Sequence, residues 1–258
     1  FSGSAVIDTA NTSGFGTEDV PAMVAIYTSH DMDGERSGAI DFQTQGLAYS
    51  LDKGRSWTKY ENNPGILNPG IKDFRDPKVR WHEPTSKWIM TLAVKDHISF
   101  YSSTNLKDWT FESDFGIDKG ANGGVWECPD LFPLTTTNGG EEKWVLLVSI
   151  NPGAYNGGSG TQYFVGEFDG KEFTSDQDTT LWLDYGRDNY AGVTWSNIPD
   201  SDDRTLFIGW MSNWDYARDV PTERWRSAMT IPRVLELSRV EGIYKVASTP
   251  IIELSSVV

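Results

Sequence analysis

One carboxylic acid in this sequence lies in an apolar stretch, where an acid requires either a stabilising partner or a chemical function. Glu127 sits inside the short apolar stretch Val125–Phe132, between a tryptophan and a cysteine, with no basic residue beside it. A strand that buries large apolar side chains rarely carries a carboxylate without a chemical or structural role. We therefore predict that Glu127 acts as a general acid/base.

A second acid, Asp76, has the opposite surroundings. It lies between Arg75 and Pro77, so that a fixed positive charge neighbours the carboxylate and a proline stiffens the chain after it. An Arg-Asp pair in a turn is also a common structural element. Two carboxylic acids in different surroundings are nevertheless the usual equipment for cleaving a glycosidic bond. Residue types and spacing alone predict Asp76 as the nucleophile of such a reaction.

The composition excludes several other classes of function. The net charge of −15 argues against nucleic acid and anionic membranes as partners. A single cysteine, Cys128, leaves no internal disulfide, and the three histidines are not spaced as a zinc-ligand pair, so we expect no metal and no cofactor. The eleven tryptophans suit stacking on sugar rings, although large β-cores use tryptophan as well.

The elements that must position these acids read as strands, and almost nothing reads as helix. Short β-branched and aromatic runs alternate with Gly, Pro, Asn and Asp clusters. One series of runs has a small or charged residue embedded, and its members begin at residues 1, 74, 125 and 190. A continuously hydrophobic second series follows it: Met23–Tyr27, Trp88–Leu92, Trp144–Val148 and Leu206–Trp210. A third series ends in a turn and an aromatic residue.

This repeated order of strands predicts an all-β protein with the four-stranded blades of a β-propeller. The first strand of each blade would then line one central channel, which brings Asp76 and Glu127 toward a shared axis. A β-sandwich is the structural alternative, but it has no reason to repeat this order. No linker or low-complexity segment divides the chain, so we expect one domain over residues 1–258.

Several of these motifs resemble signature motifs of glycoside hydrolase family 32, the family of invertases, inulinases, levanases and related fructosyltransferases. The motifs are Phe1-Ser-Gly-Ser4, Phe74-Arg-Asp-Pro77 and Trp126-Glu-Cys-Pro-Asp130, with further matches at Gln162–Gly170, Asp188–Ala191, Gly209–Trp214 and Trp225–Ala228. They occur in family order over nearly the whole chain. The resemblance implies a five-bladed β-propeller followed by a β-sandwich, and retaining transfer of a fructosyl group.

The resemblance also implies roles for individual residues. Glu127 matches the acid/base, and Asp76 matches the transition-state stabiliser that holds fructose hydroxyls, so it replaces the nucleophile predicted from spacing. Arg75, Phe1 and Ser2 match substrate-binding positions. Trp214 matches an indole lining the fructose site, where stacking on a sugar face adds on the order of 1 kcal/mol.

The sequence departs from the family at the nucleophile. The family's Asn-Asp-Pro-Asn-Gly motif does not occur in these residues, and Asn63-Pro-Gly65 and Asn151-Pro-Gly153 lack its aspartate. The chain opens in strand-like sequence without a start methionine. We therefore expect blades two to five of a five-bladed propeller, with the first blade and its nucleophile motif, and the C-terminal sandwich, outside these 258 residues. The chain alone is then expected to be inactive.

The expected function is cleavage of β-fructofuranosidic bonds in fructans or sucrose by a secreted or periplasmic enzyme. Two alternatives remain open, a fructan-binding propeller without catalysis and a fructosyltransferase of the same family. A propeller glycosidase acting on arabinose or xylose is a third, against which the Phe-Ser-Gly-Ser and Glu-Cys-Pro motifs argue. The sequence does not indicate an oligomeric state.

Overall fold

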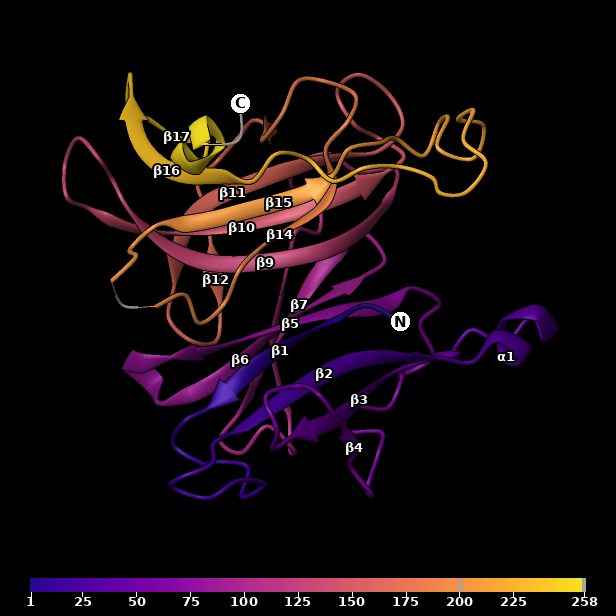
Figure 1. Cartoon of the computed structure of the whole chain (residues 1–258). Helices are drawn as coiled ribbons and strands as arrows, with labels where there is room; N and C mark the ends of the chain where they lie inside the picture. Colours follow the sequence, from indigo (N-terminus) through magenta and orange to yellow (C-terminus); the bar gives the residue numbers. More distant parts are fainter. Residues whose placement is uncertain (200, 257–258) are drawn as a thin grey trace. The chain divides into compact units, whose positions relative to one another are not determined.

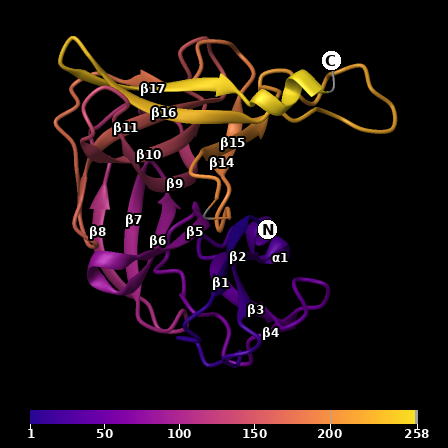
Figure 2. The same cartoon turned by 60° about the vertical axis from the view of Figure 1, so that its left-hand side comes forward.

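The computed structural model describes residues 1–199 and 201–256, and within these the strands form four antiparallel sheets. Each sheet is built from strands that follow one another along the chain, as Figure 1 and, from another side, Figure 2 show. Such a meander of four strands is the blade of a β-propeller. The predicted all-β fold is confirmed, and a sandwich does not fit this order of strands.

The first two sheets hold the N-terminal half of the strands. The first contains β1 (Gly3–Asp8), β2 (Ala22–His30), β3 (Gln43–Ser50) and β4 (Thr58–Lys59). The second contains β5 (Phe74–His82), β6 (Lys87–Val94), β7 (His97–Ser103) and β8 (Thr110–Phe115).

The last two sheets follow the same plan. The third contains β9 (Val125–Thr135), β10 (Glu142–Asn151), β11 (Gly160–Phe168) and β12 (Phe173–Thr174), with β13 (Leu181–Trp182) also paired to β11. The fourth contains β14 (Tyr190–Thr194), β15 (Thr205–Trp210), β16 (Arg233–Val240) and β17 (Ile243–Pro250). The four predicted first strands are therefore β1, β5, β9 and β14.

A short helix is present that the sequence pattern does not predict. Helix α1 (Met32–Ser37) buries no residue, so its sequence lacks the apolar periodicity by which a helix is predicted. Its ends define it instead. The side chain of Asp31 accepts hydrogen bonds from the first turn, and Gly38 closes the helix in the left-handed conformation. Two 3₁₀ segments, η1 (Glu83–Thr85) and η2 (Ile252–Ser256), complete the helical elements among the described residues.

The chain divides into two compact units, each with its own core. The first unit is Phe1–Ile117 with Phe168–Glu172, and the second is the described part of Asp118–Glu167 and Phe173–Val258. The first core is formed by buried side chains of the β1–β4 and β5–β8 sheets, among them Ile26, Leu47 and Met90. The second is formed in the same way by the other two sheets, and Phe207 lies fully buried in it.

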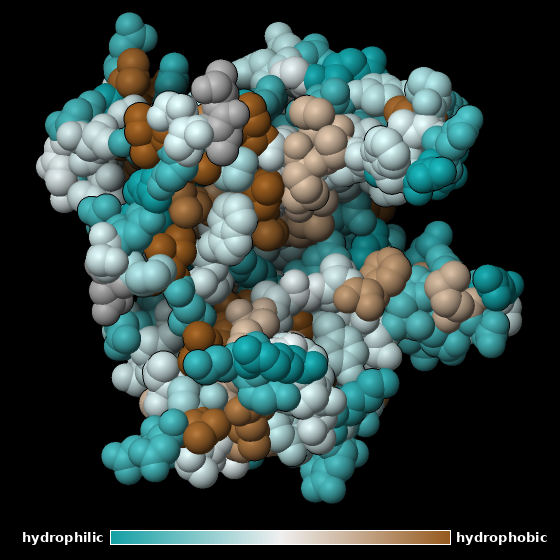
Figure 3. Space-filling view, viewed as in Figure 1, coloured by the Kyte–Doolittle hydropathy of each residue, from teal (hydrophilic) through white to brown (hydrophobic). Residues whose placement is uncertain are grey.

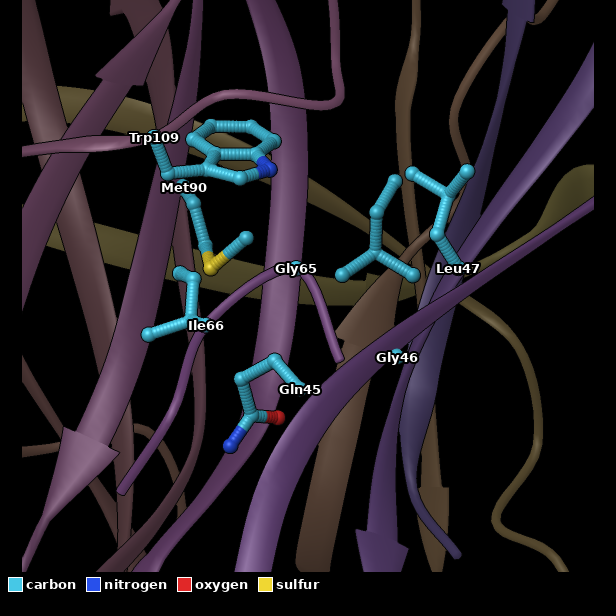
Figure 4. Close-up of a pocket in the computed structure, with 8 residues that line it drawn as sticks. Gln45, Gly46, Leu47, Gly65, Ile66, Met90 and Trp109 are labelled. Carbon is cyan, nitrogen blue, oxygen red and sulfur yellow. The ribbon is translucent and has the colours of Figure 1, made fainter. Parts of the chain in front are cut away.

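A small gap lies inside the first core, and Figure 4 shows the residues around it. Its walls are mostly apolar, and Trp109 and Met90 lie on one side. The one side-chain amide on its wall, Gln45, bonds to Thr28 Oγ1 and to the carbonyl of Phe74. This gap is a feature of packing, without groups that could do chemistry.

The hairpin turns after the third strands repeat one hydrogen-bond scheme. Asp52 accepts bonds from the hydroxyl of Ser50 and from the hydroxyl and backbone N–H of Ser56. The Ser56 bonds, more than the Ser50 bond, lower the pKa of Asp52 to about 2. In the next sheet Asn105 occupies the same place, bonded to the hydroxyl of Ser103 and accepting from backbone N–H groups. The sequence repeat is thus matched by a repeated turn.

The face drawn in Figure 3 is chiefly hydrophilic, with hydrophobic residues in separate groups. None of the helices among the described residues is long and apolar enough to cross a bilayer.

Candidate active site

Three of the four first strands carry the same backbone irregularity near their starts. The register of β5, β9 and β14 against the neighbouring strand shifts there, as it does at a β-bulge. At each shift one residue other than glycine has a positive φ: Asp76 (64°), Cys128 (48°) and Ala191 (54°). Such backbone angles are uncommon for these residues and concentrate at functional sites.

The bulges also define equivalent positions in different blades. Arg75, Glu127 and Tyr190 each stand one residue before the positive-φ residue. Two of these three residues are ones that the sequence analysis selects for chemistry. The third, Tyr190, is bonded to one of them, as described below.

In the first unit, Asp76 is held on several sides. The hydroxyl of Ser2 donates a hydrogen bond to the Asp76 carboxylate, which is 7% exposed. The backbone N–H of Asp76 donates to Thr28 Oγ1 at 3.1 Å, and Thr28 in turn donates to Gln45 Oε1 at 2.9 Å. The bulge therefore rests on a chain of buried polar groups that begins on β2 and continues to β3.

Two residues after Ser2, the side chain of Ser4 connects β1 to β5. Its hydroxyl donates to the carbonyl of Pro77 and accepts from the N–H of Val79, both at 3.0 Å. Ser2, just before β1, and Ser4, within β1, thus have different partners, a carboxylate and the backbone. Strand β1, which begins directly after Ser2, is therefore anchored to β5, which carries Asp76.

Arg75 and Phe1 lie in the same unit as Asp76. The guanidinium of Arg75 is paired with Asp73 Oδ1 at 2.6 Å, a partner that the sequence analysis does not name. The Phe1 ring is 73% exposed and stacks on the His30 ring, with 4.8 Å between centroids. The same His30 ring is held through its Nε2, which lies 3.0 Å from Glu35 Oε2. An exposed aromatic ring that is held in place by stacking on a second ring is suited to contact with a ligand.

In the second unit, Glu127 is half-buried while its neighbour Trp126 is fully buried, as the alternation of a strand requires. The hydroxyl of Tyr190 donates a hydrogen bond to Glu127 Oε2. Tyr190 is 3% exposed and packs edge-on against Trp210, and Trp210 in turn packs against Trp214. A carboxylate, a phenol and two indoles therefore form one continuous group.

Contacts from β14 to β9 and to β10 fix this group. Thr194 donates from its N–H and its hydroxyl to Asp130 Oδ2, at 2.6 and 2.7 Å. The N–H of Ala191 donates to Ser149 Oγ at 3.0 Å, just as the N–H of Asp76 donates to Thr28 in the first unit. Asp130 is 1% exposed, so its part here is to hold the strands together.

The structure thus places the sequence-selected residues in two groups. Phe1, Ser2, Arg75 and Asp76 lie in the first unit, and Glu127 and Trp214 lie in the second. The convergence of Asp76 and Glu127 on one axis stays a prediction. Sequence analysis places Tyr190 in the first-strand series but does not identify it as the hydrogen-bond partner of Glu127.

No group of three or more potential metal-ligating side chains occurs among residues 1–199 and 201–256.

Fold and site together define a β-propeller protein in which two bulged first strands, β5 and β9, each carry a carboxylic acid that accepts a hydrogen bond from a hydroxyl. The particular family follows from comparison with known sequences. The profile of the glycosyl hydrolases family 32 N-terminal domain matches residues 1–250, so this chain belongs to that family.

Individual relatives agree with this assignment. The chain is 55% identical to a levanase of Bacillus subtilis over 260 residues, covering all of this chain and 37% of that protein. It is 44% identical to an extracellular exo-inulinase of Aspergillus niger, covering 94% of this chain and 49% of that protein. The chain therefore spans about a third to a half of the length of these relatives.

A solved structure confirms the fold. The fructofuranosidase of Schwanniomyces occidentalis, determined with fructose, is similar with a TM-score of 0.87 at 40% identity, covering 98% of this chain and 49% of that one. The fold is accordingly that of the five-bladed propeller enzymes of family 32.

Proposed function

We propose that this chain supplies the acid/base and the transition-state stabiliser of a retaining glycosidase that cleaves β-fructofuranosidic bonds of fructans or sucrose. The names of the relatives support the substrate class, since they are a levanase, an exo-inulinase and a fructofuranosidase. Their description as extracellular, in the case of the exo-inulinase, supports a secreted or periplasmic enzyme.

In the proposed chemistry Glu127 acts twice. As a general acid it gives its proton to the glycosidic oxygen, so that the leaving sugar departs as an alcohol. It then takes a proton from water, which attacks the fructosyl-enzyme and releases fructose. The first half-reaction also needs a nucleophile, and the family motif that supplies it does not occur in these 258 residues. We propose that the 258 residues alone release no fructose.

Asp76 is assigned a different role, because it is buried and bonded to Ser2. A fixed carboxylate is suited to hold sugar hydroxyls, whose hydrogen bonds strengthen as positive charge develops on the ring. Arg75, Phe1 and Trp214 are assigned to substrate binding, where Trp214, 42% exposed, offers an indole face to a sugar.

The observation that carries the proposal is the Glu127–Tyr190 hydrogen bond at the bulge of β9. It gives the half-buried acid a fixed donor partner beside two indoles, on a strand whose other large side chains belong to the core.

The test is Glu127→Ala in the complete encoded polypeptide that contains this chain, with initial rates measured on sucrose, inulin and levan. We expect cleavage to slow by about 10²–10⁴-fold, with a much smaller loss on a fructoside whose leaving group needs no proton. Thermal unfolding of the same variant checks that the fold is retained. An unchanged rate on sucrose would refute the role of Glu127.

The same measurement separates the alternatives. A fructosyltransferase would place the fructosyl group on a sugar hydroxyl instead of water, so oligosaccharides would accumulate in place of free fructose. A fructan-binding propeller would retain fructan without any cleavage in the complete polypeptide.

A further inference from the structure

An exposed pair of tyrosines in the second unit has no part in the site described so far. Tyr155 and Tyr185 are 66% and 58% exposed, and their rings meet edge to face with 5.3 Å between centroids. They lie on two different loops, the first between β10 and β11 and the second between β13 and β14. Exposed aromatic pairs of this kind commonly mark a binding surface.

Both tyrosines are presented by closed turns. Tyr155 follows Ala154, whose carbonyl accepts a hydrogen bond from the N–H of Gly157 at 3.0 Å, so that Tyr155 stands at the tip of a β-turn. Tyr185 is held in a second turn, because the carboxylate of Asp184 accepts from the N–H of Gly186 at 2.7 Å. The side-chain amide of Asn156 donates to the carbonyl of Tyr185 and links the two turns.

Asn213, which is fully buried, fastens both turns to a third loop. Its amide nitrogen lies 3.2 Å from the carbonyl of Gly157 and 2.8 Å from the carbonyl of Arg187, one contact for each turn. The space is tight, since a Cβ on Gly158, whose φ is +63°, would lie 2.0 Å from Asn213 Oδ1. The tyrosine turns and the loop after β15 therefore form one rigid assembly.

This assembly is continuous with the acid/base group. Trp214 directly follows Asn213, and its N–H donates to the hydroxyl of Ser159 in the loop that bears Tyr155. The loops also leave the sheets at the end where Glu127 lies, because Asn151 pairs with Val125 at the start of β9 and Trp210 pairs with Tyr190 at the start of β14. The loops that bear Trp214, Tyr155 and Tyr185 thus lie at the same end of their sheets as Glu127.

We propose that Tyr155 and Tyr185 form a subsite for the further sugar units of a fructan chain, beyond the fructose that is cleaved. The inference rests on the proposed function, since it extends that site to polymeric substrate. Sugars present C–H faces to aromatic rings and hydroxyls to polar groups. The exposed Arg187–Asp215 ion pair beside these turns supplies both donors and acceptors for such hydroxyls. Rigid presentation lowers the entropy cost of binding a flexible chain.

The experiment measures binding and cleavage in the complete encoded polypeptide. Tyr155→Ala is compared with the parent for kcat/KM on sucrose and on inulin- and levan-type oligosaccharides of increasing length. Loss of one stacking contact is expected to lower the oligosaccharide-to-sucrose ratio of kcat/KM about fivefold, or about 1 kcal/mol. The loss should grow with chain length and appear in KM, whereas Tyr155→Phe should restore the parent ratio.

Phe111→Ala is the matched control. Phe111 is 52% exposed and also meets a tyrosine edge to face, with 5.6 Å between ring centroids, but it lies on β8 of the first unit. Its removal should change neither activity nor the ratio. Equal loss on sucrose and on oligosaccharides, or an unchanged ratio for Tyr155→Ala, would overturn the subsite.

A binding measurement keeps this inference separate from the proposed function. Migration of the Glu127→Ala protein through gels containing levan or inulin reports polymer binding without cleavage, and adding Tyr155→Ala should weaken the retardation about fivefold. If the parent cleaves nothing, the proposed function fails while the retardation still tests the subsite. If Tyr155→Ala instead abolishes a concentration-dependent dimer and leaves retardation unchanged, the tyrosines are a contact between copies and the subsite is wrong.

Discussion

The hydrogen bond from Tyr190 to Glu127 gives the sharpest prediction about catalysis. Tyr190→Phe removes only the hydroxyl, and the remaining ring keeps its place against Trp210 because Tyr190 is 3% exposed and packed. A hydrogen bond to a charged group is worth about 1.5–3 kcal/mol. Since Glu127 is half-buried, we take the lower end, about 1.5 kcal/mol, which corresponds to about a tenfold loss of rate.

The assay distinguishes positioning of the acid from a general loss of structure. If Tyr190 orients Glu127 for proton transfer, Tyr190→Phe should lower kcat on sucrose about tenfold with little change in KM. An aryl fructoside with a good leaving group needs little proton donation, so its cleavage should fall much less. Thermal unfolding should show a folded variant.

A double-mutant cycle gives the result that would refute this reasoning. When Glu127 is already alanine, Tyr190→Phe has no acid left to orient and should change the rate less than about twofold. A full tenfold loss in that background would mean that Tyr190 acts on the substrate or on the fold, and not through Glu127.

The remaining predictions concern three polar residues of the first unit, Ser2, Ser4 and Asp52. Ser2→Ala, which removes one hydrogen-bond donor to the buried Asp76, should lower kcat/KM on sucrose about tenfold, with a smaller fall in melting temperature than Ser4→Ala causes, because Asp76 keeps its backbone bond to Thr28. Ser4→Ala leaves the N–H of Val79 without its acceptor, so the melting temperature should fall by several degrees at about 1–3 kcal/mol, with activity per folded molecule retained; the reverse pattern in either variant would contradict this division. Asp52 has its pKa lowered to about 2, so its ionised form stabilises the fold above about pH 4, and that contribution is lost as the pH falls toward 2. Asp52→Asn should therefore melt below the parent at pH 7, and the two melting curves should converge between pH 4 and pH 2; a constant gap would show that ionisation is not the cause.

The order of the strands could be read from the sequence because each blade repeats it. An embedded small or charged residue identifies β5, β9 and β14 as first strands, and a charged one such as Asp76 or Glu127 is unusual in a buried strand. The ends of the strands are less visible. For example, β9 continues to Thr135, past the apolar stretch that ends at Phe132, because ladder hydrogen bonds with β10 do not depend on side-chain type.

The contacts that fix the site could not be read from the sequence. The donor to Glu127 lies 63 residues away, and Asn213 joins loops that begin more than 50 residues apart. These partners are determined by how the sheets pack, and local patterns of residue types carry no information about that packing. Helix α1 was missed for a different reason, since capping by Asp31 and Gly38, and not an apolar face, holds it.

The bulges of β5 and β9 offer a physical reason for the different roles that we propose for the two carboxylates. Asp76 is itself the positive-φ residue of its bulge, and its side chain is buried against Ser2. Glu127 precedes the equivalent residue, Cys128, and remains half-buried with a longer side chain. A short, enclosed acid is suited to hold a ligand in place, whereas a longer acid with some freedom can give a proton to one oxygen and take it from another. The two acids therefore differ by one residue in their position at the bulge. This difference accords with Asp76 as stabiliser and Glu127 as acid/base, and we expect that neither can replace the other.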